Sequence, residues 1–264
     1  MVITAGFIGL GSQGGGMAQR IADSGIELVV WARRPEALER FAGRAVLAST
    51  PEELGAACDV VGICVTDGAA VREVASAVLP DMRAGSVLAI HSTVGVEDCE
   101  AIARAARDVR VIDAPVSGGG AAAEEGRLTV YVGGDDDAVA YARPVLETYG
   151  PVLHMGALGT GQRTKLINNA LNAAHFALAH DAFAIGDSLG IDVDLLADAL
   201  LSGSGRSFSL EVFSMMRTID PIKEMLGPIM SKDVGLFAAE SRGAENKTLL
   251  ATADRFLELL EVER

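Results

Sequence analysis

Short apolar runs alternate with helical patterns along the first 154 residues of the chain. The runs that are apolar enough to form strands are residues 5–10, 28–31, 45–47, 60–65, 87–90, 109–112, 128–132 and 152–154. Most of them are continuous, which is typical of strands that are covered on both faces. The helical patterns between them are residues 14–24, 35–40, 51–56, 69–79 and 96–107. Because strands and helices alternate, we expect a parallel sheet with right-handed crossover connections.

The pattern changes after residue 161. Residues 162–189 contain no proline and a single glycine, Gly186, so they predict one helix of roughly 42 Å at ~1.5 Å per residue. Gly190 suits the end of that helix, and Asp192 can cap a next helix that reaches Leu200. Later helical patterns cover residues 210–218, 234–241 and 246–260, and we expect no strand after residue 154.

These patterns predict an α/β fold class with two domains. Residues 1–160 are expected to form a Rossmann-type, doubly wound sheet, and residues 161–264 an all-α domain for substrate binding and oligomerisation. The long helix would join the two domains.

Composition limits the partners of the chain. Half of its 264 residues are hydrophobic, so one or two domains can each bury a core. The formal net charge of -14 disfavours nucleic acid, although one local basic pocket is enough to bind a small anion. Apolar runs stay below the ~18 residues of a membrane span, so we expect no membrane partner.

Cysteine spacing and the N-terminal segment bear on the compartment. Cys58, Cys64 and Cys99 form no CxxC pair and are odd in number, which favours reduced thiols. The N-terminal "MVITAGFIGLG" has no basic region of the kind that opens a signal peptide. We therefore expect a cytoplasmic protein.

A glycine-rich turn, "GFIGLGSQGGGMA" at residues 6–18, follows the first strand and opens a helix. Gly9, Gly11 and Gly14 have the G-x-G-x-x-G spacing of a dinucleotide-binding fingerprint. The first glycine permits the tight turn, the second lets a pyrophosphate approach the backbone, and the third allows close packing of helix on strand. The residues predicted to bind cofactor here are Gly9, Leu10, Gly11, Ser12, Gln13 and Gly14.

The end of the second strand distinguishes NADP from NAD. NAD enzymes usually place an acidic residue there to hold the ribose 2′-OH, ~20 residues after the glycines. This chain has Ala32 at that position, followed by Arg33 and Arg34. A guanidinium can bind a 2′-phosphate and stack on adenine. We therefore predict NADP, with NAD as the alternative cofactor and a solvated arginine pair as the plainer interpretation.

Lys165 and Asn169 in "KLINNA" are one helical turn apart and share a helix face. From the residues alone they are either a solvated stripe or part of an active site. A lysine ammonium can donate a proton to a carbonyl, and the amine can accept one if its pKa falls below ~10.4. "SGGG" at residues 117–120 offers backbone N–H groups to a carboxylate. A small hydroxy acid therefore suits this combination better than a bulky apolar alcohol.

We expect no metal site. The histidines His91, His154, His175 and His180 lack ligand spacing with carboxylates, and we interpret them as structural. Residues 135–137, three aspartates, are interpreted as an exposed acidic turn. "GTGQRTK" lacks the G-K-[ST] ending of a phosphate-binding P-loop, so phosphoryl transfer is not expected.

Further segments follow one another in a fixed order along nearly the whole chain. They are "FIGLGSQGGGMA", "STVG", "DAPVSGGGAAAEEGRLTVYVGG", "GTGQRTKLINNAL", "SGSGRSFSL" and "MSKDVGL". Together they resemble the β-hydroxyacid dehydrogenase family, which includes 3-hydroxyisobutyrate dehydrogenase and tartronate semialdehyde reductase.

The resemblance implies roles on the substrate side. Lys165 matches the catalytic lysine of the family, and Asn169 matches the asparagine that orients substrate beside it. Ser117, Gly118 and Gly119 match the loop that holds the substrate carboxylate.

The resemblance also implies roles on the cofactor side. Thr93 matches a residue near both nicotinamide and substrate. Val65 and Thr66 fall where the loop after the fourth strand passes the cofactor. Lys232 matches a lysine near the cofactor, and Asp233 is its neighbour.

The chain departs from the family pattern at several positions. Gln13 replaces a methionine and can add a hydrogen bond to the pyrophosphate loop. Ala122 replaces a glycine, Arg127 a threonine, and His180 with Asp181 an Ala-Glu pair. These departures bear on the substrate more than on the reaction.

The combined prediction is an NADP-preferring oxidoreductase that moves hydride between nicotinamide and a small 3-hydroxy acid or its semialdehyde. An imine reductase-like enzyme of the same fold, which usually lacks the lysine, is one alternative, and a non-catalytic cofactor-binding module is another. A 6-phosphogluconate-type oxidative decarboxylation would use Arg206 as a phosphate ligand. We also expect a homodimer or tetramer, because the apolar helices of the second domain need a packing partner.

Overall fold

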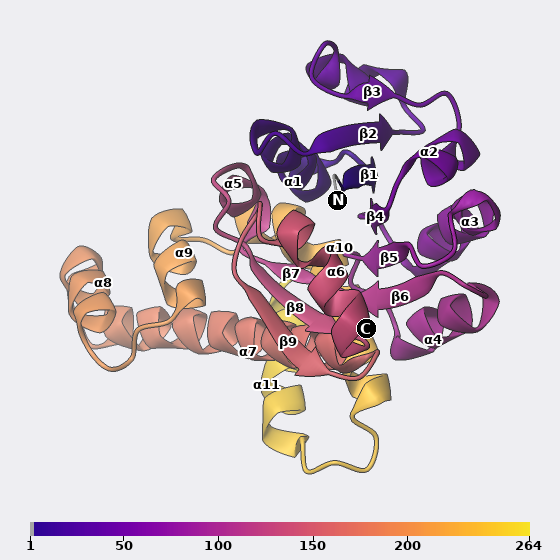
Figure 1. Cartoon of the computed structure of the whole chain (residues 1–264). Coiled ribbons are helices and arrows are strands. Elements are labelled where there is room, and N and C mark those ends of the chain that lie inside the picture. Colours follow the sequence, from indigo (N-terminus) through magenta and orange to yellow (C-terminus); the bar gives the residue numbers. More distant parts are fainter. Residues whose placement is uncertain (1–2) are drawn as a thin grey trace. The chain divides into compact units, whose positions relative to one another are not determined.

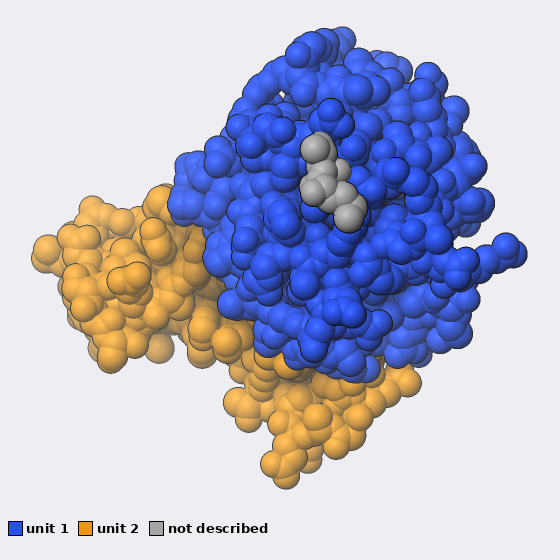
Figure 2. All heavy atoms as spheres, in the orientation of Figure 1, with its two compact units in different colours: residues 1–165 blue, residues 166–264 orange. Residues whose placement is uncertain are grey.

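The computed structural model describes residues 3–264. The chain forms two compact units, Met1–Lys165 and Leu166–Arg264, which Figure 2 colours separately. Helix α7 (Thr160–Ser188) begins in the first unit and ends in the second. Both the expected domain boundary at residues 160/161 and the boundary between the units fall in the first turns of this helix.

Unit 1 is a sheet flanked by helices (Figure 1). Its strands are β1 (Thr4–Ile8), β2 (Glu27–Trp31), β3 (Val46–Leu47), β4 (Val60–Ile63), β5 (Val87–Ile90), β6 (Arg110–Asp113), β7 (Val116–Ser117), β8 (Thr129–Gly133) and β9 (Val152–Gly156). Its helices are α1 (Ser12–Asp23), α2 (Pro51–Ala57), α3 (Gly68–Val78), α4 (Val96–Ala105), α5 (Gly119–Glu124) and α6 (Asp136–Leu146), with 3₁₀ helices η1 (Pro35–Phe41) and η2 (Leu79–Asp81).

The strand order is β3-β2-β1-β4-β5-β6-β8-β7, and β9 pairs with β8. Strands β1 to β6 are parallel, as expected. The expectation of a wholly parallel sheet is wrong beyond β6, because β8 runs antiparallel to both β6 and β7. The connection from β7 to β8 contains only a short helix and reverses the chain, so it makes an antiparallel pair rather than a crossover.

Each central strand buries side chains on both faces of the sheet. Phe7 of β1 and Val60 of β4 join an apolar cluster that includes α1 and α6. Their neighbours Ile8 and Val61 join a second cluster with α2, α3 and α4 on the opposite face. The continuous apolar runs of the sequence therefore have the predicted cause, which is burial of the parallel sheet on both sides.

Three elements of unit 1 were not expected. Strand β7 is very short, and helix α5 starts within "SGGG", a run whose glycines do not predict a helix. The acidic turn expected at residues 135–137 is instead the start of α6, with Asp135 as the N-cap. Asp136 and Asp137 lie in the first turn of α6, where the helix dipole favours negative charge.

Unit 2 is helical, as expected. It contains most of α7, then α8 (Val193–Ser202), α9 (Phe208–Met216), α10 (Asp220–Glu240) and α11 (Lys247–Leu259). Gly190 has a φ of +70° and ends α7, and the Asp192 side chain accepts hydrogen bonds from the first N–H groups of α8. Within residues 3–264 no helix is both long and apolar enough to cross a membrane.

Helix α10 is much longer than the predicted residues 234–241. The helix continues through Gly227 and Pro228, two residues that disfavour a helix interior. Pro228 is exposed, so its ring sits on the solvent side, where a missing hydrogen bond is compensated by water.

Candidate active site

The predicted cofactor residues of unit 1 gather where the strand order reverses. Strands β2 and β4 pair with opposite edges of β1, and open α/β sheets bind ligands at the carboxyl ends of strands at such a point. The glycine turn follows β1, and Val65 and Thr66 follow β4. The two loops are in contact, since a Cβ built on Gly9 would lie 2.1 Å from the Cys64 carbonyl oxygen.

The three fingerprint glycines have three different surroundings. Gly9 has a φ of +93°, a conformation that favours glycine. A Cβ on Gly14 would lie 1.9 Å from the Gly9 carbonyl oxygen, so this position must be small for α1 to start here. No atom lies within 4 Å of a Cβ built on Gly11. The turn is therefore tight on the protein side and open at Gly11, which fits a pyrophosphate lying against the backbone and the start of α1.

Arg33 and Arg34 follow β2 after Ala32, and both are exposed. The Arg33 guanidinium pairs with Glu73 at 3.2 Å, and both side chains are 70% exposed. A pair this exposed contributes little to stability, so Arg33 can leave Glu73 at little cost in free energy and bind a phosphate instead.

The loop that contains Thr93 is tied to the loop that contains Val65. The Val65 backbone N–H donates to the Ser92 hydroxyl at 2.8 Å. Two regions predicted to contact the cofactor, after β4 and after β5, are therefore connected by a direct hydrogen bond.

Gln162 was not predicted as a site residue, yet it is fully buried and holds the backbone around Thr93. Its Nε2 donates to the Ser92 carbonyl at 2.8 Å, and its Oε1 accepts from the Val94 N–H at 3.2 Å. The partners are 70 and 68 residues away in sequence. Its only sequence signal is its place three residues before Lys165.

Asp113 anchors the start of α7. Its carboxylate accepts from the Gly159 and Gln162 N–H groups, each at 2.6 Å. These N–H groups at a helix start have no partner within the helix, so the aspartate acts as a cap from a distant strand. Burial raises the pKa of Asp113 to about 6, and the two backbone hydrogen bonds oppose that rise.

Ser117 ends β7, Gly119 begins α5, and Gly118 connects the two. Gly118 has a φ of +138° and Gly119 a φ of +79°, so both positions favour glycine. A Cβ on Gly120 would lie 2.2 Å from the Ser12 hydroxyl oxygen. The predicted carboxylate loop therefore lies beside the first residue of α1, next to the predicted pyrophosphate turn.

Lys165 and Asn169 lie on α7 and are 8% and 5% exposed. They are therefore not a solvated stripe. Both belong to one buried face of the helix, which also includes Gln162. Buried lysine is rare in proteins unless it is paired or functional.

Asn169 belongs to a chain of polar contacts within unit 2. Its Nδ2 donates to Asp233 Oδ2 at 2.5 Å, and the other carboxylate oxygen of Asp233 pairs with Lys232 at 2.5 Å. Asn168 Nδ2 donates to Asn169 Oδ1 at 3.1 Å, which fixes the orientation of the Asn169 amide. The sequence identified Asp233 only as the neighbour of Lys232, whereas the structure adds its bond to Asn169.

His91, the residue before Ser92, is structural as predicted. Its Nδ1 lies 2.7 Å from the Ala114 carbonyl oxygen, so Nδ1 carries the hydrogen, and Nε2 accepts from the Tyr149 hydroxyl at 3.1 Å. The ring stacks on Phe7 with centroids 5.7 Å apart. Burial lowers the pKa of His91 to about 4, so the imidazole is neutral at physiological pH.

The cysteines are free thiols, as expected. Burial raises the pKa of Cys58 and of Cys64 to about 12, which makes both thiols unreactive. Among the described residues, no group of three or more His, Cys, Asp or Glu side chains could hold a metal ion.

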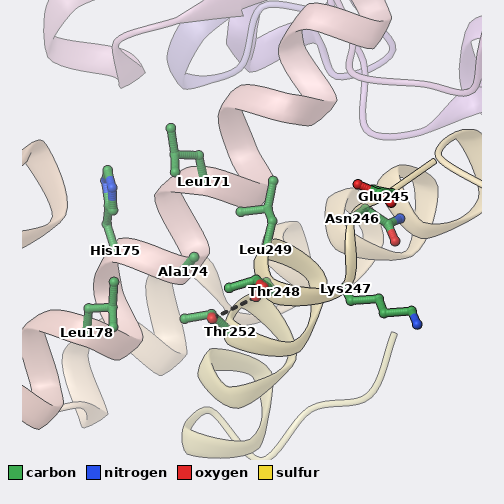
Figure 3. A pocket seen from close by; sticks show the side chains of 10 residues that line it. All are labelled: Leu171, Ala174, His175, Leu178, Glu245, Asn246, Lys247, Thr248, Leu249 and Thr252. Carbon is green, nitrogen blue, oxygen red and sulfur yellow. Dashed lines mark hydrogen bonds between the residues drawn. The ribbon is translucent and has the colours of Figure 1, made fainter.

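A hollow of about 520 Å³ lies in unit 2 between α7 and the start of α11 (Figure 3). Its wall includes Leu171, His175 and Leu178 of α7. It contains none of the predicted catalytic residues, so volume alone does not mark the active site of this chain.

A doubly wound sheet with a glycine turn at its switch point, followed by a long helix that buries a lysine in its first turns, defines a class of protein: dehydrogenases that use a nicotinamide dinucleotide. Residues 4–158 match the model of the NAD binding domain of 6-phosphogluconate dehydrogenase. Residues 159–261 match the model described as NAD-binding of NADP-dependent 3-hydroxyisobutyrate dehydrogenase.

Individual relatives agree with these matches. The chain is 36% identical to L-threonate dehydrogenase of Cupriavidus necator over 78% of this chain and 72% of that protein. It is 32% identical to the human mitochondrial 3-hydroxyisobutyrate dehydrogenase over 94% of this chain and 78% of that protein. A solved structure of Mycobacterium tuberculosis 3-hydroxyisobutyrate dehydrogenase with L-serine is 28% identical, with a TM-score of 0.85 over 99% of this chain and 94% of that chain.

The chain belongs to the β-hydroxyacid dehydrogenase family. It is an NAD(P)-dependent oxidoreductase that acts on a CH–OH group.

Proposed function

We propose that this protein is an NADP-preferring enzyme that interconverts small 3-hydroxy acids and their semialdehydes, with Lys165 as the acid/base. The observation that carries the proposal is the burial of Lys165 and Asn169 on one face of α7. Lysine is seldom buried in proteins, and a catalytic role explains its place beside a buried amide.

The proton chemistry follows from these two side chains. A bound nicotinamide cofactor supplies or accepts the hydride. The Lys165 ammonium would protonate the carbonyl oxygen during reduction, and the amine would take the hydroxyl proton during oxidation. An amide nitrogen has two hydrogens, so Asn169 can donate one to Asp233 and the other to the same substrate oxygen.

The substrate carboxylate would bind at Ser117, Gly118 and Gly119. No atom lies within 4 Å of a Cβ built on Gly119, so the backbone of this turn is open to an anion. The names of the relatives, an L-threonate dehydrogenase and 3-hydroxyisobutyrate dehydrogenases, support a small hydroxy acid as the substrate class.

We propose NADP rather than NAD because Ala32, Arg33 and Arg34 follow β2 without an acidic residue for the ribose 2′-OH. Val65, Thr66, Thr93 and Lys232 would complete the cofactor site. Since NADPH is the abundant reduced cofactor in cells, aldehyde reduction is the proposed direction. The free thiols support a cytoplasmic location.

A substrate panel tests the proposal directly. 3-Hydroxyisobutyrate, L-serine, L-threonate and 6-phosphogluconate would be oxidised with NADP or NAD, and tartronate semialdehyde, succinic semialdehyde and a cyclic imine reduced with NADPH or NADH. We expect a C3–C4 hydroxy acid or semialdehyde to be the best substrate. A cyclic imine or 6-phosphogluconate as the best substrate would contradict the proposal.

The same assay tests the arginines. Arg33→Ala should lower kcat/KM for NADPH about tenfold, or ~1.4 kcal/mol, with little change for NADH. Arg104→Ala, which changes an exposed arginine of α4 that pairs with Glu100, is the matched control. Equal use of both cofactors by the wild type would refute the arginine argument.

We also propose that unit 2 mediates self-association into a dimer or tetramer. Helix α7 and the residue that follows it expose a series of large apolar side chains, each at least 45% exposed: Ile167, Leu171, Leu178, Ile185 and Leu189. Contiguous exposed apolar surface of this kind is typical of subunit interfaces. Leu171 and Leu178 also line the hollow of Figure 3.

A further inference from the structure

Gln162 connects the cofactor side of unit 1 to the helix that bears Lys165. Its two amide atoms bond to the residues on either side of Thr93, namely the Ser92 carbonyl and the Val94 N–H. Because both contacts are to backbone, they fix the path of the loop at Thr93 whatever the rotamer of the threonine side chain.

The pair of bonds requires an amide of this length. One partner is an acceptor and the other a donor, so the side chain at position 162 must both donate and accept. A glutamate could accept from Val94 but would repel the Ser92 carbonyl, and a methionine of similar volume could make neither bond. The buried backbone groups would then lack partners, which is costly in a water-free environment.

The backbone of Gln162 is held as firmly as its side chain. Asp113 accepts from the Gln162 N–H at 2.6 Å and from the Gly159 N–H at 2.6 Å. A Cβ on Gly133 or Gly161 would lie 2.4 or 2.7 Å from an Asp113 carboxylate oxygen, so small residues on two elements make room for this carboxylate. The first turn of α7 is thus fixed to β6, and through Gln162 to the loop after β5.

We propose that Gln162 is a positioning residue that sets the place of Thr93 relative to Lys165, with Asp113 fixing Gln162 in turn. Lys165 is three residues, less than one helical turn, beyond Gln162 on α7. A shift of the loop would therefore change the distance between a residue at the nicotinamide and the acid/base. This inference rests on the proposed roles of Thr93 and Lys165.

The main test is Gln162→Met, measured beside Gln19→Met. Gln19 lies on α1 and its amide donates to the surface residue Asp23, so the control makes the same change away from the site. Misplacing a reacting group by about 1 Å can cost 10²-fold in rate. We expect kcat to fall about 10- to 100-fold in Gln162→Met, with the Kd for NADPH within about twofold of wild type, and no change in Gln19→Met. A kcat equal to that of the control would overturn the proposal.

A double-variant cycle separates positioning from general loss of structure. If Gln162 acts through Thr93, then Gln162→Met should cost little in a Thr93→Val background, because the position it controls has already lost its function. Fully additive losses would overturn the proposal. Gln162→Asn, whose amide is one methylene shorter and cannot reach both backbone partners, should also lower kcat and serves as the test if Gln162→Met does not fold.

Hydrogen exchange distinguishes this inference from the proposed function. The amide of Val94 should exchange faster in Gln162→Met than in wild type or Gln19→Met. Faster exchange of the Val94 amide in Gln162→Met, together with a wild type that turns over nothing in the substrate panel, would support the hydrogen bond between Gln162 and Val94 but refute the proposed function. An active wild type with unchanged exchange and unchanged kcat in Gln162→Met would refute the positioning role alone.

Discussion

The first turns of helix α7 bury polar side chains beside apolar ones, whereas its later turns bury apolar side chains. Its first turns bury polar groups, namely Gln162, Lys165 and Asn169. Further along, Leu178 and Ile185 are 56% and 58% exposed. At about 100° per residue, the polar positions fall within about 60° of one another, and the exposed apolar series of α7 lies on the other side of the helix.

Surface helices usually bury apolar side chains and expose polar ones, whereas α7 buries polar groups near its start and exposes apolar ones on its other side. The two features have separate explanations. At the N-terminal end, Asp113 and the loop at Thr93 supply partners for Gln162, and Asp233 supplies one for Asn169, so the burial of these polar groups can serve chemistry. At the C-terminal end, the buried face is filled by apolar residues such as Phe176 and Phe183. The exposed face there has side chains that a second copy of the chain would cover under our proposal.

The largest expected effect is at the polar end. Lys165→Ala should lower kcat by 10²- to 10⁴-fold, the range of general acid–base catalysis, because no proton would be delivered to the substrate oxygen. Steady-state kinetics on the best substrate measures this loss. Lys247→Ala, at an exposed lysine that opens α11, is the matched control and should retain wild-type kcat. An undiminished rate in Lys165→Ala would remove the chemical half of the comparison.

The second effect is at the apolar end. Ile185→Glu should weaken self-association about 100-fold, because burying an isoleucine side chain contributes roughly 1.5–3 kcal/mol and the new charge resists burial. Analytical ultracentrifugation across a concentration series measures the change. The control is Asp187→Ala, an exposed position two residues along the same helix but about 200° around it. A wild-type protein that stays monomeric at high concentration would show that the exposed series has another purpose.

Most of the fold could be predicted from the sequence because strands and helices follow from patterns among neighbouring residues. Parts of the candidate site depend on contacts between residues that are distant in the sequence. The alternation of strands and helices and the length of α7 are local patterns, and both agree with the structure. Helix α5 was missed because local propensity disfavours its glycines, while packing of Gly120 on Ser12 overrides it. Helix α10 was predicted too short because a proline is tolerated at an exposed position.

The candidate site also contains residues that local patterns predict and residues that they do not. Lys165 and Asn169 could be proposed because their spacing and the surrounding motif are local. Gln162 and Asp113 could not, because their partners are far away in the sequence: those of Gln162 lie in the loop after β5, and Asp113 is 46 and 49 residues from the amides that it caps. Pairing across such distances is decided by the tertiary fold.

The smallest expected effect concerns pH, which should act on the polar end of α7. The folded-state pKa of Asp113 is raised from 3.8 to about 6. Between these two pH values the carboxyl group is protonated in the folded protein but ionised in the unfolded chain. Its contribution to stability is therefore present at low pH and is lost as pH rises through 6. His91 has the opposite sign. Its folded-state pKa is lowered to about 4, so stability is lost as pH falls from about 6.5 to 4.

Between pH 6 and 4 the two effects oppose each other in the wild type, and Asp113→Asn removes one of them. The Tm of Asp113→Asn should therefore fall relative to wild type as pH is lowered through this window, by roughly 5–10 °C in total. Asp198→Asn changes an exposed aspartate of α8, and its Tm difference from wild type should stay nearly constant. A difference for Asp113→Asn that is equally flat would mean that the carboxylate is ionised throughout the window. In that case the start of α7 would be insensitive to mild acid, as its apolar end is expected to be.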